Sequence, residues 1–97
     1  MSEETVLSLW RGRIPIRRTM ARILDEVSEE SGISVADLKS PARFRFIAWP
    51  RQYAMWRMVN EGLWSLPQIG RFFNRDHTTV IWAFRQVEKR NALERAA

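Results

Sequence analysis

A short polar run, Asp76-His77-Thr78-Thr79, stands directly before an apolar segment with helical periodicity that begins at Val80. Asp76 suits the N-cap of a helix, because its carboxylate can accept a hydrogen bond from a free backbone N–H. His77 and the two threonines would then occupy the first turn. Such side chains offer the donors, acceptors and methyl groups that read base edges in the major groove of DNA. The pattern equally fits an ordinary helix start, with a capping aspartate and a surface imidazole.

His77 is the single histidine of the chain, and the chain has no cysteine. These counts exclude a thiolate metal site, a disulfide framework and a site built on two histidines. A serine nucleophile paired with His77 is not excluded by residue type, but no motif supports one. A domain of 97 residues also leaves little room for a substrate pocket. We therefore expect no enzymatic activity and no cofactor.

Basic residues concentrate in the second part of the chain. Residues 1–40 carry six basic and seven acidic residues, whereas residues 41–97 carry ten basic and four acidic residues. Fourteen of the sixteen basic residues are arginine, whose planar guanidinium can bind phosphate or guanine through two parallel hydrogen bonds. The second part is where a polyanion would dock, although a solvated face that maintains solubility explains the charge equally well.

No segment suits a membrane or a secretory signal. No apolar run approaches the roughly 20 residues that cross a bilayer, and the chain starts with Glu3 and Glu4 where a signal would be basic. We therefore expect a cytoplasmic, nucleoid-associated protein. Residues 1–18 are expected to form an N-terminal arm, because Gly12 and Pro15 interrupt any regular structure. This arm could follow a DNA backbone or remain a flexible terminus.

Apolar residues at helical spacing, together with capping signals, predict a single all-α domain of about five to six helices over residues 19–97. The helices are expected at residues 19–31, 34–38, from near Trp49 to 61–62, 66–73 and 77–91. Ser34 and Ser65 are expected to cap the second and fourth of these, because each begins a capping box.

The start of the third helix is ambiguous. Pro50 suits the first turn of a helix better than its interior, because it lacks a backbone N–H, and this places the start near Trp49. Residues 43–47 alternate basic and apolar side chains like a strand, but no partner strand is predicted elsewhere. We interpret them as the approach to this helix or as its first turns.

The last two predicted helices are joined by only a few residues, and Gly70 allows them to pack closely, which is the outline of a helix-turn-helix. In such units the second helix enters the major groove and its first turns face the bases. Its stripe opposite the core forms a polar and basic surface with one aromatic ring, made of Thr78, Trp82, Arg85 and Lys89.

Four segments, in order, resemble the C-terminal DNA-binding domain of the bacterial replication initiator DnaA, a helix-turn-helix fold of the Trp-repressor-like type. They are Ile33-Ser34-Val35-Ala36-Asp37-Leu38, Trp49-Pro50-Arg51-Gln52, Ser65-Leu66-Pro67-Gln68-Ile69-Gly70 and Asp76-His77-Thr78-Thr79-Val80. The resemblance covers about residues 19–95, at nearly the spacing of the family. It implies that the third helix continues through Pro50, and that the ligand is double-stranded DNA with a DnaA-box-like site.

The resemblance also implies roles for individual residues. The residues implied to contact bases are Arg43, Ala48, Asp76, His77, Thr78 and Thr79. Of these, Arg43 would enter the minor groove, Ala48 would pack on a thymine methyl and Asp76 would accept from a cytosine amino group. The residues implied near the DNA backbone are Arg45, Arg51, Gln52, Leu66 and Pro67. To these we add four residues in or beside the second helix of the helix-turn-helix: Arg75, Trp82, Arg85 and Lys89.

Two tryptophans depart from the family pattern. Trp49 stands where the family usually has arginine, and Trp82 stands where it usually has histidine. Trp56 and Trp64 are expected to leave a further apolar surface. The alternative hypothesis is therefore a protein-interaction module that binds the replication initiator or another partner through a tryptophan-rich surface.

The leading hypothesis is sequence-specific binding of duplex DNA without ATPase activity. The 97 residues contain no Gly-x-x-x-x-Gly-Lys-Ser/Thr loop, so we expect a DNA reader without the motor of an initiator. Such a reader would modulate replication initiation or transcription by competing with a full-length initiator for the same sites. The relatives of the fold favour a monomer over a dimer.

Overall fold

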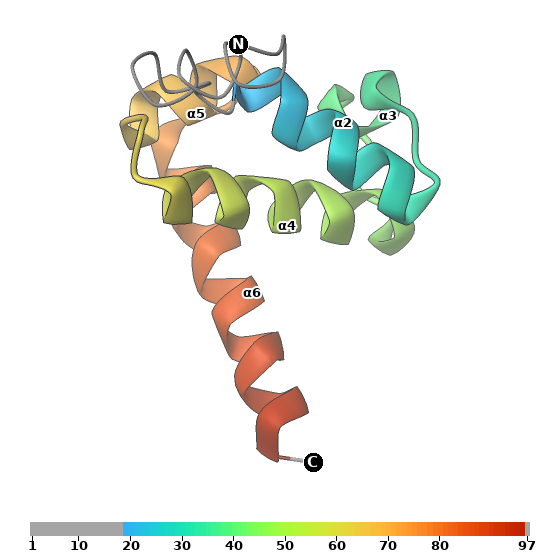
Figure 1. The fold of residues 1–97 in the computed structure, drawn as a ribbon, viewed down its shortest axis with the longest axis vertical. Helices are drawn as coiled ribbons and strands as arrows, with labels where there is room; N and C mark the ends of the chain where they lie inside the picture. Colours follow the sequence, from blue (N-terminus) through green and yellow to red (C-terminus); the bar gives the residue numbers. More distant parts are fainter. Residues whose placement is uncertain (1–18, 97) are drawn as a thin grey trace, which may run out of the picture.

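The computed structural model describes residues 19–96, and these form five α-helices (Figure 1). The helices are α2 (Met20–Ser31), α3 (Val35–Lys39), α4 (Arg45–Glu61), α5 (Leu66–Phe72) and α6 (His77–Ala96). No residue from 19 to 96 lies in a β-strand, which confirms the predicted all-α fold. None of these helices is both long and apolar enough to cross a membrane. The arm predicted for residues 1–18 lies outside the described residues.

Local hydrogen bonds cap the N-termini of the two short helices, α3 and α5, at the residues that the sequence predicted. The Ser34 hydroxyl accepts from the Asp37 N–H at 3.1 Å and caps α3. At α5 the capping box is complete, because the Ser65 hydroxyl accepts from the Gln68 N–H at 3.3 Å and the Gln68 side chain accepts from the Ser65 N–H at 2.8 Å. Both predicted caps are confirmed.

Two predicted helix ends are wrong. α4 begins at Arg45 rather than near Trp49, and Pro50 lies inside it. The missing N–H of Pro50 costs a hydrogen bond, but Ile47 and Arg51 on either side of it are both buried, and their packing holds the helix together. α6 runs to Ala96 rather than ending near Asn91. No glycine or proline follows Asn91, so nothing in the sequence breaks the helix there.

α4 crosses the middle of the molecule, and the other helices pack around it (Figure 1). The first half of α6 crosses α4, while its second half extends beyond the other helices to the C-terminus. The core contains the apolar stripes that helical spacing predicted. Its fully buried larger side chains are Ile23, Leu24, Val27, Leu38, Met55, Met58, Ile69, Phe73 and Val80.

α5, a tight turn and α6 form the predicted helix-turn-helix. The Gly70 carbonyl accepts from the Phe73 N–H at 3.1 Å and from the Arg75 N–H at 2.8 Å, so the chain reverses within a few residues. Asn74 adopts a left-handed backbone with a φ of 56°, which this reversal requires. A Cβ on residue 70 would lie 2.6 Å from the Arg75 carbonyl oxygen, so only glycine fits this crossing without a shift.

The tryptophans are not distributed as predicted. Trp56 and Trp64 are half-buried rather than exposed, because Trp64 packs on the core and the Trp56 indole N–H donates to the Glu88 carboxylate at 2.8 Å. The prediction that Trp56 and Trp64 leave a further apolar surface is therefore wrong. Of the four tryptophans in residues 19–96, Trp49 and Trp82 are the more exposed, at 46% and 55%.

Candidate nucleic-acid interface

Asp76 is the N-cap of α6. One oxygen of its carboxylate accepts from the Thr78 N–H at 3.0 Å and from the Thr78 hydroxyl at 3.1 Å. These bonds, the backbone one first, lower the pKa of Asp76 below its ordinary value, so the carboxylate is charged at neutral pH. The same oxygen lies 3.0 Å from Nδ1 of His77. The carboxylate therefore contacts both His77 and Thr78, the first two residues of the helix.

The first turn of α6 presents polar side chains to solvent. His77 and Thr78 are exposed, Thr79 is half-buried and Val80 lies in the core. Further along the helix, Trp82, Arg85 and Lys89 are exposed on the same stripe as Thr78, which confirms the predicted outer face. The helix N-terminus adds free N–H groups and a positive dipole end, both of which favour an anionic ligand.

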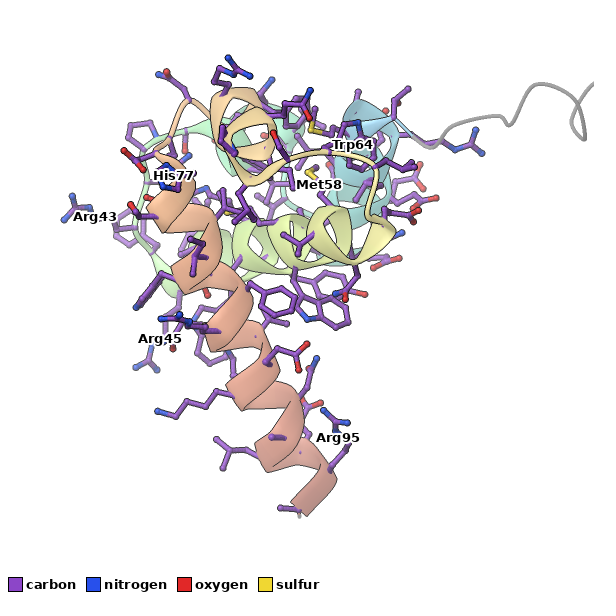
Figure 2. The ribbon with its side chains drawn as sticks, turned by 90° about the vertical axis from the view of Figure 1, so that its left-hand side faces the viewer. Arg43, Arg45, Met58, Trp64, His77 and Arg95 are labelled. Atoms are coloured by element: carbon purple, nitrogen blue, oxygen red, sulfur yellow. The ribbon has the colours of Figure 1, made fainter. Side chains whose placement is uncertain are left out.

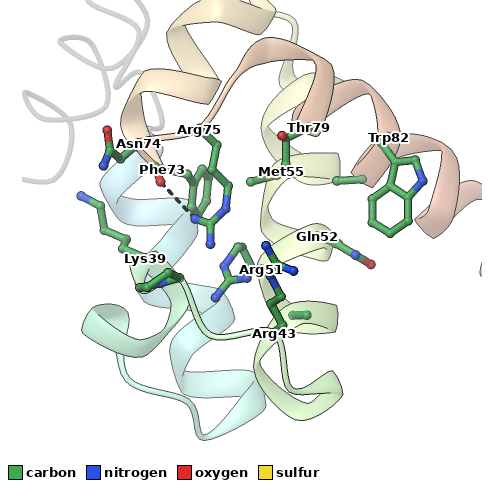
Figure 3. Close-up of a pocket in the computed structure, with 13 residues that line it drawn as sticks. Lys39, Arg43, Arg51, Gln52, Met55, Phe73, Asn74, Arg75, Thr79 and Trp82 are labelled. Carbon is green, nitrogen blue, oxygen red and sulfur yellow. Dashed lines mark hydrogen bonds between the residues drawn. The ribbon is translucent and has the colours of Figure 1, made fainter.

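A cavity of about 620 Å³ opens between residues 39–43, the first half of α4 and the start of α6 (Figure 3). We call it the basic groove, because its charged lining residues are Lys39, Arg43, Arg51 and Arg75, with no acidic residue among them. It brings together seven residues that the sequence singled out from separate segments: Arg43, Ala48, Arg51, Gln52, Arg75, Thr79 and Trp82.

The groove combines basic lining residues with apolar ones. Phe73, Met55 and Ala83 are buried side chains that contribute to its lining. Trp82 lines its α6 side, while half-buried Ala48 lines its α4 side. Figure 3 shows Trp82 away from the group formed by Lys39, Arg51 and Arg75. The basic side chains could bind an anionic strand of a ligand, and the apolar side chains could contact an apolar edge of the same ligand.

Arg51 and Arg75 point into the basic groove but are engaged by the protein itself. Arg51 is only 6% exposed, and its guanidinium donates to the carbonyls of Leu38 at 2.6 Å and Ser40 at 2.8 Å. Arg75 donates to the same Ser40 carbonyl at 2.7 Å and to the Phe73 carbonyl at 3.0 Å. Burial, and then the charge of Arg75, lower the pKa of Arg51 to about 10, so it remains protonated at neutral pH. These contacts could not be predicted from the sequence, because their partners lie on other elements of the fold.

Arg43 lies at the rim of the groove, whereas Arg45 does not line it, and both side chains are exposed. Figure 2 shows them on the same side of the molecule as His77. Arg45 lies 5.7 Å from the Trp49 ring, and Arg90 lies 4.2 Å from it, so that this ring contacts two guanidiniums. Arg90 also donates to the side chain of Gln52. Trp49 does not line the basic groove.

The remaining predicted residues lie outside the groove. Pro67 is exposed in the first turn of α5, and Leu66 is partly buried against the core. Arg85 and Lys89 lie further along α6 and do not line the groove either. Within residues 19–96 there is no group of three histidine, cysteine or acidic residues that could hold a metal ion.

Two polar lining residues, Lys39 and Asn74, were missed by sequence reasoning. Lys39, the last residue of α3, and Asn74, in the turn, both line the groove. The Lys39 ammonium lies 4.2 Å from the Phe72 ring, which directs it toward the turn. Its position just before the Ser40-Pro41 break, in the same basic region as Arg43, is the signal that could have identified it.

Comparison with known proteins places this chain in a family. The family model described as the bacterial dnaA protein helix-turn-helix matches residues 20–87. The chromosomal replication initiator protein DnaA of Zymomonas mobilis is 47% identical over 74 residues, which is 75% of this chain and 15% of the relative. DnaA of Lactococcus lactis is 49% identical over 71 residues, or 71% of this chain and 15% of the relative. DnaA of Caulobacter vibrioides is 44% identical over 81 residues, or 82% of this chain and 16% of the relative.

The chain thus spans less than a fifth of the length of these initiators. The match runs from α2 into α6 and includes the complete helix-turn-helix. It covers the residues that line the basic groove and those that form the first turn of α6. The chain belongs to the bacterial DnaA helix-turn-helix family, whose domain binds DNA in replication initiation.

Proposed function

We propose that the chain reads duplex DNA sequence-specifically at DnaA-box-like sites. The observation that carries the proposal is the exposed first turn of α6, with His77 and Thr78, beside a groove lined by four cations and no acid. Asp76, His77, Thr78 and Thr79 would face base edges in the major groove. Arg43, exposed at the rim of the groove, would enter the adjacent minor groove, where narrow A·T-rich sequence attracts arginine.

The remaining contacts would fix the protein on the duplex. Ala48 would pack on a thymine methyl, and Trp82 would lie against the sugar-phosphate edge. The residues proposed for the phosphate backbone are Arg45, Gln52, Leu66, Pro67, Arg85 and Lys89. Leu66 and Pro67 would act through the backbone N–H groups at the start of α5, since neither side chain carries a donor. Arg51 and Arg75 add positive charge, while their donors are directed to protein carbonyls.

This reader would act without catalysis or ATP hydrolysis of its own. The 97 residues include no phosphate-binding loop, and the described residues offer no metal site. By occupying sites that a full-length initiator uses, it would modulate replication initiation or transcription. We propose that it does so as a monomer at the nucleoid, because the contacts proposed above all come from one chain.

The test is a fluorescence-anisotropy titration at near-physiological salt with a duplex that carries an initiator box and with a scrambled duplex of equal composition. We expect the box to bind at least about 10³-fold more tightly, as specific sites typically do. The slope of log affinity against log salt should be about −0.9 for each phosphate neutralised. Equal affinity for the two duplexes would contradict sequence-specific reading.

Thr78→Ala should relax base preference rather than abolish binding. Loss of a base contact typically costs about 1–3 kcal/mol, so we expect affinity for the box to fall about tenfold or more. Affinity for the scrambled duplex should change less than about twofold, because phosphate contacts remain. Lys89→Ala is the matched control, from the same helix face, and should weaken both duplexes equally. The same loss on both duplexes for Thr78→Ala would show that Thr78 does not read bases.

A second candidate is binding of a protein partner, the replication initiator being the one proposed. The observation that favours it is an aromatic surface at the start of α4, where Phe44, Phe46 and Trp49 are 66%, 63% and 46% exposed. Phe44 and Phe46 stack with ring centroids 5.7 Å apart. Binding of purified initiator that is lost in Trp49→Ala, by a protein that binds neither duplex, would favour this candidate over the first.

A further inference from the structure

We propose that Arg51 and Arg75 are positioning residues: together they hold the Ser40 carbonyl and thereby fix the segment that carries Arg43 at the rim of the basic groove. We call these two side chains and the Ser40 carbonyl the arginine clamp. The inference deepens the proposed function and rests on it, because Arg43 is the residue proposed to read the minor groove.

The clamp joins three parts of the fold at one oxygen atom. Arg51 comes from α4 and lies 11 residues from Ser40 in sequence, while Arg75 comes from the turn before α6 and lies 35 residues away. Their donor nitrogens lie 2.8 Å and 2.7 Å from the same carbonyl oxygen. Figure 3 shows the two guanidiniums side by side in the groove. Such charge-assisted bonds are roughly twice as strong as neutral ones, and partial burial strengthens them further.

The segment between α3 and α4 has few other anchors. Its own hydrogen bonds are short-range: the Ser40 hydroxyl donates to the Asp37 carbonyl at 2.6 Å and accepts from the Ala42 N–H at 3.3 Å. Pro41, Arg43 and Phe44 are all exposed, so no apolar side chain of this stretch is inserted in the core. Phe44, the N-cap of α4, makes no side-chain capping bond. The position of Arg43 therefore depends on the clamp.

The clamp also ties the two proposed readers to each other. Arg75 directly precedes Asp76, the N-cap that orders the first turn of α6. Through Ser40, the same side chain reaches the segment of Arg43. A fixed separation between a major-groove element and a minor-groove arginine is what binding of a rigid duplex requires, because ordering either of them on binding would cost affinity.

The geometry requires arginine and not merely a positive charge. The Arg51 fork donates to both the Leu38 and Ser40 carbonyls, and the Arg75 fork donates to both the Phe73 and Ser40 carbonyls. A lysine at either position keeps the charge but has a single ammonium on a flexible stem, which cannot reproduce a planar fork. Arginine-to-lysine exchange therefore separates positioning from charge.

The experiment is a double-mutant cycle with Arg75→Lys, Arg43→Ala and the double variant, with affinities measured by anisotropy on the box and scrambled duplexes. We expect Arg75→Lys to weaken box binding about as much as Arg43→Ala, roughly tenfold. The double variant should lose no more than Arg43→Ala alone, because Arg75 acts through Arg43. Binding to the scrambled duplex should be unchanged by Arg75→Lys. Arg95→Lys, the same exchange at an exposed position in the last turn of α6 to which no DNA contact is assigned, is the matched control and should change box affinity less than about twofold.

Hydrogen exchange of the free protein provides a readout that needs no DNA. Arg75→Lys should speed the exchange of amides in residues 40–44, including the Ala42 N–H that the Ser40 hydroxyl accepts, while α2 stays protected. Unchanged exchange together with additive losses in the cycle would overturn the clamp. Faster exchange in a protein whose wild type does not prefer the box would support the clamp and reject the proposed reading of DnaA-box-like sites.

Discussion

Replacement of Gly70 by alanine is expected to destabilise the domain by about 2–3 kcal/mol, although alanine is the better helix former by about 1 kcal/mol. The added Cβ would lie 2.6 Å from the Arg75 carbonyl oxygen and 3.3 Å from the backbone of Asp76 and His77. These are backbone atoms, which cannot rotate away as a flexible side chain could. The turn must therefore shift as a unit, and the N-cap of α6 must shift with it.

The measurement is urea unfolding of Gly70→Ala followed by circular dichroism, together with box affinity under conditions where the variant is folded. A loss of 2–3 kcal/mol corresponds to a melting temperature lower by roughly 10 °C or more in a domain of this size. Gly62→Ala is the control: residue 62 has a φ of 72° but no atom within 4 Å of the added Cβ. It should cost about 1–2 kcal/mol through backbone strain alone and leave box affinity unchanged. If Gly70→Ala were as stable as the wild type, the close approach of residue 70 to the backbone of the turn would be contradicted.

Phe73→Ala is expected to have the largest effect on stability, a loss of about 3–5 kcal/mol. Phe73 is 1% exposed and is among the largest fully buried side chains. It lies where the core meets the basic groove, so its removal leaves a cavity directly beneath the turn of the helix-turn-helix. Small domains are typically stable by only about 5–15 kcal/mol. The variant should therefore be close to unfolding at physiological temperature.

The measurement is the free energy of unfolding of Phe73→Ala and of Phe72→Ala, each determined by chemical denaturation under the same conditions. Phe72 is the preceding residue and contacts the Phe73 ring edge-to-face at 5.2 Å between centroids, but it is only half-buried. Because less apolar surface is lost, Phe72→Ala should cost less than about half as much. Equal losses in the two variants would show that the core does not extend beneath the turn as the structure has it.

The sequence correctly predicted those features that depend on interactions between residues close together in the chain. Ser34, Ser65 and Asp76 cap their helices through bonds to residues two or three positions ahead, so a short window of sequence contains both partners. The apolar stripes of the helices are equally local, since period alone selects the buried face. The first turn of α6, with its exposed His77 and Thr78, follows directly from the Asp76 cap and was predicted from it.

The sequence alone misplaced features that depend on packing. Local rules put the start of α4 near Trp49 because of Pro50, whereas burial of Ile47 and Arg51 extends the helix back to Arg45. They also treated Trp56 as exposed, but a partner 32 residues away, Glu88, accepts its indole N–H. In both cases a contact from outside the local window outweighs the local preference.

The basic groove likewise has features that the sequence predicted and features that only the tertiary structure shows. Its residues could be singled out in the sequence by type and by resemblance, and Arg43, Ala48, Thr79 and Trp82 do line one cavity. Only the tertiary structure decided that Arg51 and Arg75 meet at the Ser40 carbonyl, because those partners lie 11 and 35 residues apart. By itself, then, the sequence determined which helices form and which side chains they expose. The tertiary structure decided which charges stay at the rim and which are turned inward, since that depends on carbonyls supplied by other elements of the fold.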